Sequence, residues 1–219
     1  MRNTEAEILA VVREIAAISL DDGIAFAPER ATAELIREED DYSGIRVTLG
    51  GTLSRASVHL HVDVNVGDPI WPEPQHVGLP RLLAGILQVR GYPLEMVLAE
   101  KVATAIARGT ANTRWRDFVD LYALAMRHPV SGATFRASLD RVAQHRKLSL
   151  TPLASVLAGY SEIAQARWVA WLRKQGLEST IPVEFSAVLD YLVAFADPII
   201  SRQMMDIGTW DPEQRHWRT

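Results

Sequence analysis

Lys101 and Asp117 are the residues whose types and spacing most clearly indicate chemistry. Lys101 ends the run Ala99-Glu100-Lys101, and Asp117 follows sixteen residues later in the run Arg114-Trp115-Arg116-Asp117. The residues around each predict a helix in which a charged group lies within or beside an apolar stripe. A lysine is a compact positive charge that neutralises phosphate oxygens. A lysine held near a carboxylate therefore suits chemistry on an anionic substrate better than it suits a hydrophobic core.

Both segments also have a purely structural interpretation. The first predicted helix carries one stripe at the i, i+3, i+4, i+7 spacing, made of Leu94, Val97, Leu98, Lys101 and Ala105. A lysine in such a stripe can extend its charge to the edge of the core. In the second predicted helix, Asp117 and Asp120 flank an apolar face, and with Arg114 and Arg116 they could form a solvated, salt-bridged helix start. The residues alone leave both interpretations open.

A strand is predicted at residues 57–66, because apolar and polar side chains alternate along it. The apolar set is Val58, Leu60, Val62, Val64 and Val66, and the polar set is His59, His61, Asp63 and Asn65. The polar face is either exposed to solvent or lines a cleft in which Asp63 holds a divalent cation or accepts a proton. His59 and His61 suit transition metals, so a metal-dependent hydrolase using them with Asp63 is a more distant alternative.

Composition limits the class of protein. The chain has 219 residues, a formal net charge of -4 and no cysteine, which excludes disulfides and thiolate metal sites. No apolar run is long enough to span a membrane, and the N-terminus lacks the apolar core of a signal peptide. We therefore expect a cytoplasmic protein with no membrane partner.

The sequence pattern changes along the chain, from short strands to long helices. A capping box at Thr4 and Glu7 predicts a first helix that ends near Ile18. Strands are predicted at residues 23–26, 32–36, 45–49 and 57–66, and a proline-rich loop at 67–80. Helices are predicted at 93–108, 114–127, 133–145, 159–174 and 183–204, with Pro198 kinking or breaking the last. The tail with Trp210 and Trp217 shows no periodicity. We therefore expect an α/β (α+β) fold, with a partial sheet domain at 1–92 and a mostly helical domain at 93–219.

Three blocks carry a resemblance to a known family. They are Asp63–Asp68, Tyr92–Lys101 and Asn112–Tyr122. Together with upstream stretches at 22–26 and 36–47, they resemble the AbiEii/MenT-type nucleotidyltransferase toxins of toxin–antitoxin systems. The resemblance covers residues 20 to 125 well. Its most specific part is the pairing of Ala-Glu-Lys with Arg-x-(Lys/Arg)-Asp-Phe-x-Asp.

The resemblance implies a polymerase-β-like nucleotidyltransferase core followed by a helical bundle. It also implies transfer of a nucleotide from a nucleoside triphosphate to an RNA end, with the tRNA 3′ end as the best-known target and magnesium as cofactor. Lys101 and Asp117 match the family's functional lysine and aspartate, and Asp63 lies where its strand places an aspartate near the cleft. Lys101 would hold the triphosphate, Asp117 would orient Lys101 or the attacking hydroxyl, and Asp63 would bind the metal or orient the nucleophile.

The same resemblance assigns substrate binding to Arg114, Arg116 and Asp120, with Arg116 in place of the more usual lysine. It also implies a cognate antitoxin as partner. A sheet that lacks some of its strands exposes an unpaired edge, so a homodimer is a further expectation.

One family motif has no counterpart here. Members carry a Gly-Ser or Gly-Gly turn followed by Asp-x-Asp, and no such segment precedes the first predicted helix, as though the first part of the fold were missing. The adjacent pairs Asp21-Asp22 and Asp40-Asp41 do not replace it, because neighbouring strand residues point to opposite faces. The alternative function is therefore a truncated, inactive relative that binds only nucleotide, RNA or antitoxin.

Overall fold

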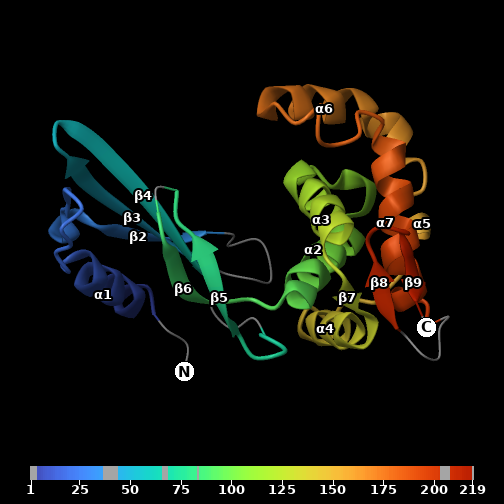
Figure 1. The fold of residues 1–219 in the computed structure, drawn as a ribbon, viewed down its shortest axis with the longest axis horizontal. Coiled ribbons are helices and arrows are strands. Elements are labelled where there is room, and N and C mark those ends of the chain that lie inside the picture. Colours follow the sequence, from blue (N-terminus) through green and yellow to red (C-terminus); the bar gives the residue numbers. More distant parts are fainter. Residues whose placement is uncertain (1–3, 37–43, 66–68, 83, 203–207, 219) are drawn as a thin grey trace. The chain divides into compact units, whose positions relative to one another are not determined.

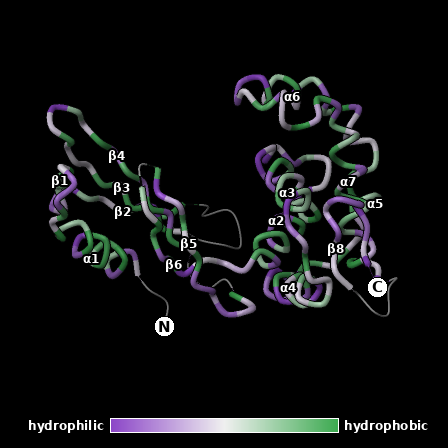
Figure 2. The backbone as a smooth tube through the Cα atoms, in the orientation of Figure 1, coloured by the Kyte–Doolittle hydropathy of each residue, from purple (hydrophilic) through white to green (hydrophobic). Residues whose placement is uncertain are grey.

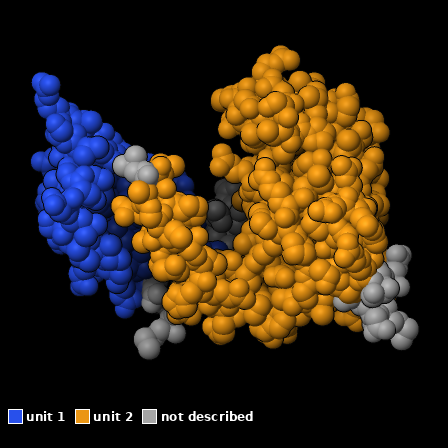
Figure 3. Space-filling view, in the orientation of Figure 1, with its two compact units in different colours: residues 1–68 blue, residues 69–219 orange. Residues whose placement is uncertain are grey.

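The computed structural model describes residues 4–36, 44–65, 69–82, 84–202 and 208–218. The chain divides into two compact units, residues 1–68 and 69–219 (Figure 3). The domain boundary predicted at residue 92 lies later in the chain and stays a prediction. The pair Asp40-Asp41, residues 66–68 of the first resembling block and the last two residues of the helix predicted at 183–204 lie outside the described residues.

Unit 1 begins with helix α1 (Glu5–Ala16), which ends close to the predicted position. The predicted capping box is confirmed, since the Thr4 side chain accepts a hydrogen bond from the Glu7 N–H and the Glu7 carboxylate accepts one from the Thr4 N–H. Four strands follow, β1 (Ile24–Phe26), β2 (Thr32–Ile36), β3 (Gly44–Leu53) and β4 (Ala56–Asn65). A 3-10 turn, η1 (Pro28–Arg30), joins β1 to β2.

The sheet of unit 1 is antiparallel (Figure 1), and its two faces carry chemically different side chains. Strand β3 pairs with β1 and β2 along one edge and with β4 along the other. Helix α1 packs on the apolar face, where Ile8 joins Ile45, Val47 and Leu49 in a small buried core. The polar residues of β4 lie on the opposite face and are exposed, as the alternation predicts.

Unit 2 opens with a β-hairpin that the sequence analysis did not identify. Strands β5 (Gln75–Pro80) and β6 (Ile86–Gly91) pair antiparallel, so the predicted loop at 67–80 is wrong over residues 75–80. The prolines made this stretch look like a loop. An isolated two-stranded ladder can accept Pro80 because proline is tolerated at edge positions.

Helices form most of the rest of unit 2, and all of them except the short helix at Leu153–Val156, which was not predicted, lie close to the predicted ranges. They are α2 (Leu94–Arg108), α3 (Trp115–Arg127), α4 (Gly132–His145), α5 (Leu153–Val156), α6 (Tyr160–Gln175) and α7 (Phe185–Ile200). Hydrophobic residues recur along them (Figure 2) and bury one large shared core. The last helix ends just after Pro198, where the Arg136 guanidinium donates to the carbonyls of Ile199 and Ile200.

The tail folds back as a small three-stranded sheet. Strands β8 (Thr209–Asp211) and β9 (His216–Arg218) pair with each other, and β8 pairs with β7 (Val130–Ser131). Trp210 and Trp217 are buried, and their indole N–H groups donate to the carbonyls of Ala125 and Phe195. The chain is therefore an α/β protein with antiparallel sheets, as predicted. Within the described residues, no helix is both long and apolar enough to cross a membrane.

Candidate functional site

Helix α2 places Lys101 at the edge of the core of unit 2. Its neighbours Leu98, Ala99 and Val102 are completely buried, whereas the Lys101 side chain keeps 20% of its surface exposed. The aliphatic part of the lysine therefore covers apolar surface, and its ammonium lies where polar groups can reach it.

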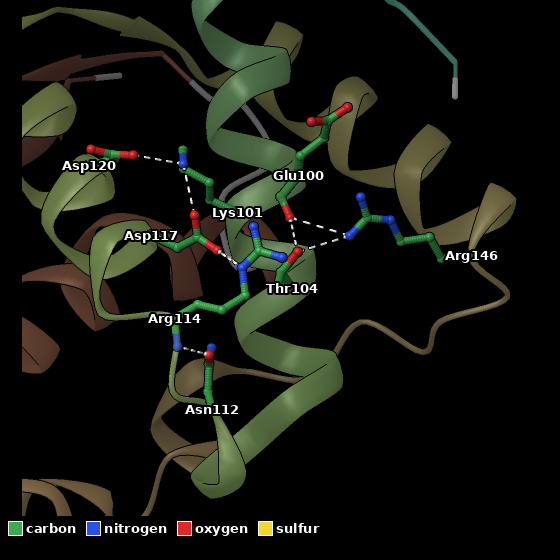
Figure 4. Close-up of polar contacts among 8 residues, drawn as sticks. All are labelled: Glu100, Lys101, Thr104, Asn112, Arg114, Asp117, Asp120 and Arg146. Carbon is green, nitrogen blue, oxygen red and sulfur yellow. Dashed lines mark hydrogen bonds and ion pairs between the residues drawn. The ribbon is translucent and has the colours of Figure 1, made fainter. Parts of the chain in front are cut away.

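Helix α3 supplies two carboxylates to that ammonium (Figure 4). The Lys101 Nζ lies 2.9 Å from Asp117 Oδ1 and 2.8 Å from Asp120 Oδ2. Asp117 and Asp120 are three residues apart and therefore share one side of the helix. The structure thus brings together Lys101, Asp117 and Asp120, which the sequence analysis singled out on two separate segments.

Arg114 adds a second cation to this group. Its Nε donates to Asp117 Oδ2 at 2.7 Å, so each oxygen of the Asp117 carboxylate accepts from a different cation. The Asp117 side chain is only 9% exposed, compared with 39% for Asp120. Asp117 is therefore the central residue of a four-residue ionic network, formed by Lys101, Arg114, Asp117 and Asp120, whose formal charges balance.

Two opposing effects set the pKa of Lys101. Burial is the largest single influence and lowers this pKa, because it disfavours the charged form. The hydrogen bonds and charges of Asp120 and Asp117 together outweigh burial, so the pKa of Lys101 lies above its ordinary value. The lysine is consequently a permanent cation at neutral pH, which fits a phosphate-binding role and does not fit a proton-transfer role.

Asn112 positions the start of α3 and was missed by the sequence analysis. Its side-chain oxygen accepts from the Arg114 N–H at 2.9 Å, and its backbone carbonyl accepts from the Tyr160 hydroxyl. Asn112 is 1% exposed, and its Nδ2 has no hydrogen-bond partner among the described residues. An asparagine two residues before a charged helix start is a known turn signal and could have identified it.

The remaining predicted substrate-binding residue, Arg116, lies apart from the network. Its side chain is exposed on α3, and in the described ranges no carboxylate pairs with it. On the other side of α2, Arg146, the residue that follows α4, donates to the Thr104 hydroxyl at 3.0 Å, and Thr104 donates to the Glu100 carbonyl (Figure 4). These contacts join α2 to α4 and hold the helix that carries Lys101.

Asp63, the third predicted catalytic residue, belongs to unit 1 and is paired there. Arg46 lies directly opposite on β3, and its Nε and Nη2 donate to the two Asp63 carboxylate oxygens at 2.7 and 2.8 Å. Next along the same face, the Thr48 hydroxyl and the His61 Nδ1 are 3.0 Å apart. Over the described part of the chain, no group of three or more His, Cys, Asp or Glu residues is arranged to hold a metal ion.

Comparison with known proteins identifies the family. No curated protein matches the chain. No solved structure matches it either. A family model described as nucleotidyl transferase AbiEii toxin, type IV toxin–antitoxin system, matches residues 2–191, which include every residue of the ionic network and Asp63. Because this match spans most of the sequence, the chain belongs to the AbiEii family of nucleotidyltransferase toxins.

Proposed function

We propose that this protein transfers a nucleotide from a nucleoside triphosphate to the 3′ end of an RNA, with tRNA as the target, and that a cognate antitoxin neutralises it. Family membership supports a nucleotide substrate and an antitoxin partner. The main structural support for the site is the position of the Lys101 ammonium, which is held between Asp117 and Asp120 at the edge of the core. A fixed cation of this kind stabilises the charge of a phosphoryl group during transfer.

The network suggests a role for each of its members. Two of the three ammonium hydrogens of Lys101 point to carboxylates, which leaves one for a triphosphate oxygen. Asp117 and Asp120 orient that ammonium, and Arg114 holds Asp117 in place. Arg116, exposed on the same helix, contributes a charge for the RNA backbone.

Magnesium belongs to the proposal, although the described residues do not form a ready site for it. Magnesium commonly binds through one or two carboxylates together with substrate phosphates. Asp63 is the carboxylate that we assign to it. Both Asp63 oxygens accept hydrogen bonds from Arg46, so a cation bound to Asp63 would use the remaining lone pairs of that carboxylate or compete with the Arg46 guanidinium for it.

Labelling of tRNA tests this function. Purified protein is incubated with magnesium, tRNA and each labelled nucleoside triphosphate in turn, and label on the tRNA is counted. We expect transfer by the wild type and none by Lys101→Ala. The matched control is Lys174→Ala, which removes an exposed lysine in the last turn of α6. Circular dichroism checks that both variants fold. Labelling of tRNA by the Lys101→Ala variant would contradict the assignment of Lys101 to the site.

A second function is favoured by the pairing of Asp63. If Arg46 keeps that carboxylate occupied, the protein binds nucleotide, RNA or antitoxin without transferring anything. The wild type then gives no label with any nucleotide, while nucleotide or RNA still protects it against thermal unfolding.

The remaining parts of the proposal concern assembly and location. Among the described strands, β4 pairs only with β3, which is consistent with a homodimer formed through the other edge of β4. Light scattering that gives the mass of one 24.3 kDa chain contradicts the dimer. We place the activity in the cytoplasm, where tRNA is available.

A further inference from the structure

A cavity opens in unit 1 at the point where one edge of β3 loses its strand partner. Strand β1 ends with Phe26 opposite Gly51, and β2 begins with Thr32 opposite Thr48. The 3-10 turn η1 occupies the gap, where the Ala27 N–H donates to the Gly50 carbonyl at 2.9 Å. The cavity has a volume of about 550 Å³ and is bounded by β1, η1, β3 and β4.

The two adjacent glycines of β3 have different structural reasons to be glycine. A Cβ on Gly51 would lie 2.8 Å from the Ala25 carbonyl oxygen, so packing against β1 requires a glycine there. A Cβ on Gly50 would meet nothing within 4 Å. Glycine inside a strand weakens it, and it often marks a place where a ligand approaches the backbone. Gly50 lines the cavity, and packing within unit 1 does not explain it.

The cavity wall also differs in charge from the rest of unit 1. Residues 1–68 contain thirteen Asp and Glu residues and six Arg residues, so this part of the chain is strongly acidic. Among the described residues, the lining nevertheless includes no carboxylate. Its charged or titratable members are Arg30 and His59, and its hydroxyl groups come from Thr48, Thr52 and Ser57.

The two basic side chains are available to a ligand. Arg30 lies 3.8 Å from Glu29 in an ion pair whose side chains are 84% and 71% exposed, and such a pair contributes little energy. His59 is directly opposite Gly50 on β4 and is exposed, beside the open space above the glycine. A guanidinium, an imidazole and several hydroxyls around bare backbone are donors suited to phosphate oxygens.

We propose that this cavity binds a phosphate group, supplied either by a nucleotide or by the backbone of an RNA. Arg30 provides the charge, His59 and the three hydroxyls provide hydrogen bonds, and Gly50 leaves room for the anion to approach the strand. The residues that line this cavity all belong to unit 1, whereas the residues of the Lys101 network belong to unit 2. Binding here requires no transfer activity, so it can be tested even if the proposed function fails.

Metal-free titration of the intact protein tests the proposal. Inorganic phosphate is added while the ring signals of the six histidines are followed by NMR, and the His59 signal is assigned with His59→Gln. We expect the His59 signal to shift in a saturable way. Gly50→Val, which fills the open space, and Arg30→Gln, which removes the charge, should each weaken binding by about tenfold or more.

Matched variants separate the site from general effects. Ala56→Val is the control for Gly50→Val, because it places a valine at an exposed position of β4. Arg55→Gln is the control for Arg30→Gln, because it removes a charge from the β3–β4 turn. Neither Ala56 nor Arg55 lines the cavity. Both should bind phosphate as the wild type does. Competition then identifies the source of the phosphate, since either a nucleoside triphosphate or a short RNA should displace it. A His59 signal that does not respond to phosphate, or equal binding by Gly50→Val, Arg30→Gln and their controls, overturns the proposal.

Discussion

The Arg46–Asp63 pair of unit 1 and the Lys101–Asp117 pair of unit 2 have similar nitrogen–oxygen distances, 2.7 and 2.9 Å, but very different surroundings. The Arg46 and Asp63 side chains are 39% and 42% exposed, whereas those of Lys101 and Asp117 are 20% and 9% exposed. Exposed pairs contribute little because water competes for both charges, and breaking a buried pair leaves one charge without compensation. Burial, and not distance, therefore decides which pair the fold depends on.

The hydrophobic cores of the two units also differ in size, and unit 2 again has the more buried residues. Among the described residues, the main core of unit 2 contains thirty-four buried hydrophobic residues, and the core of unit 1 contains five. A small core has fewer contacts to lose and can relax more readily around a deletion. The two units should consequently respond unequally to similar substitutions.

The largest effect is expected from truncating a central aromatic residue of unit 2. Phe118 of α3 is 1% exposed and contacts the rings of Tyr160 and Phe185. Phe118→Ala should lower the free energy of unfolding by about 3–5 kcal/mol. All six tryptophans lie in residues 69–219, so tryptophan fluorescence during urea unfolding follows unit 2.

Leu49→Ala makes the corresponding change in unit 1. Leu49 is 3% exposed, and its truncation should cost about 2–3 kcal/mol in a transition seen by far-ultraviolet circular dichroism. The fluorescence transition should not move. If Leu49→Ala shifts the fluorescence transition as much as Phe118→Ala does, the two units unfold together and the contrast between them disappears.

A smaller effect is expected from removing the central carboxylate of the ionic network. Asp117→Ala removes the carboxylate that pairs with Arg114 and leaves Lys101 paired with Asp120. The loss should be about 2–3 kcal/mol by fluorescence-detected unfolding. The matched change in unit 1, Asp63→Ala, should cost less than about 1 kcal/mol. Equal losses for the two substitutions would show that burial does not separate these pairs.

The fold was predictable from sequence where the local signals were strong. The capping box fixed the start of α1, and alternation fixed β4 almost to the residue. Strand β3 runs four residues beyond the predicted end because Gly50 and Gly51, which usually indicate a turn, continue the ladder. Strands β8 and β9 have three residues each, too short to show periodicity, and they depend on Trp210 and Trp217 packing against distant helices.

The site was predictable as a set of residues but not as a set of contacts. Helical spacing alone placed Lys101 within one apolar stripe and Asp117 beside another. That Asp120 shares the Lys101 ammonium depends on how α2 and α3 pack, which no local pattern encodes. The partner of Asp63 depends on the register of β3 and β4. The turn between these strands has no Asn-Gly pair that would indicate its position from sequence. Instead, Ser54 adopts the positive φ, 55°, that such turns require.

The smallest expected effect is on the stability of the fold at alkaline pH. It reports on Lys101 separately from the other residues of the ionic network. The raised pKa of Lys101 means that the folded protein keeps its proton at a pH where the unfolded chain begins to lose it. The stabilisation that protonated Lys101 gives the folded protein is therefore complete below the ordinary lysine pKa. It is lost as pH rises through the higher pKa that Lys101 has in the folded state. For one proton the slope cannot exceed about 1.4 kcal/mol per pH unit.

Lys101→Arg removes this titration without removing the charge, because arginine stays protonated in both the folded and the unfolded states. Burial raises the pKa of Tyr191 to about 12 and also raises that of Tyr160, so both tyrosines add their own loss of stability at high pH. Those losses occur in the wild type and the variant alike and cancel in the difference. Urea unfolding by fluorescence, between about pH 9 and 11.5, should show the wild type losing stability faster than Lys101→Arg. Parallel declines would mean that the carboxylates of α3 do not hold the proton on Lys101, and the network would then resemble the exposed pair of unit 1 in its energetics.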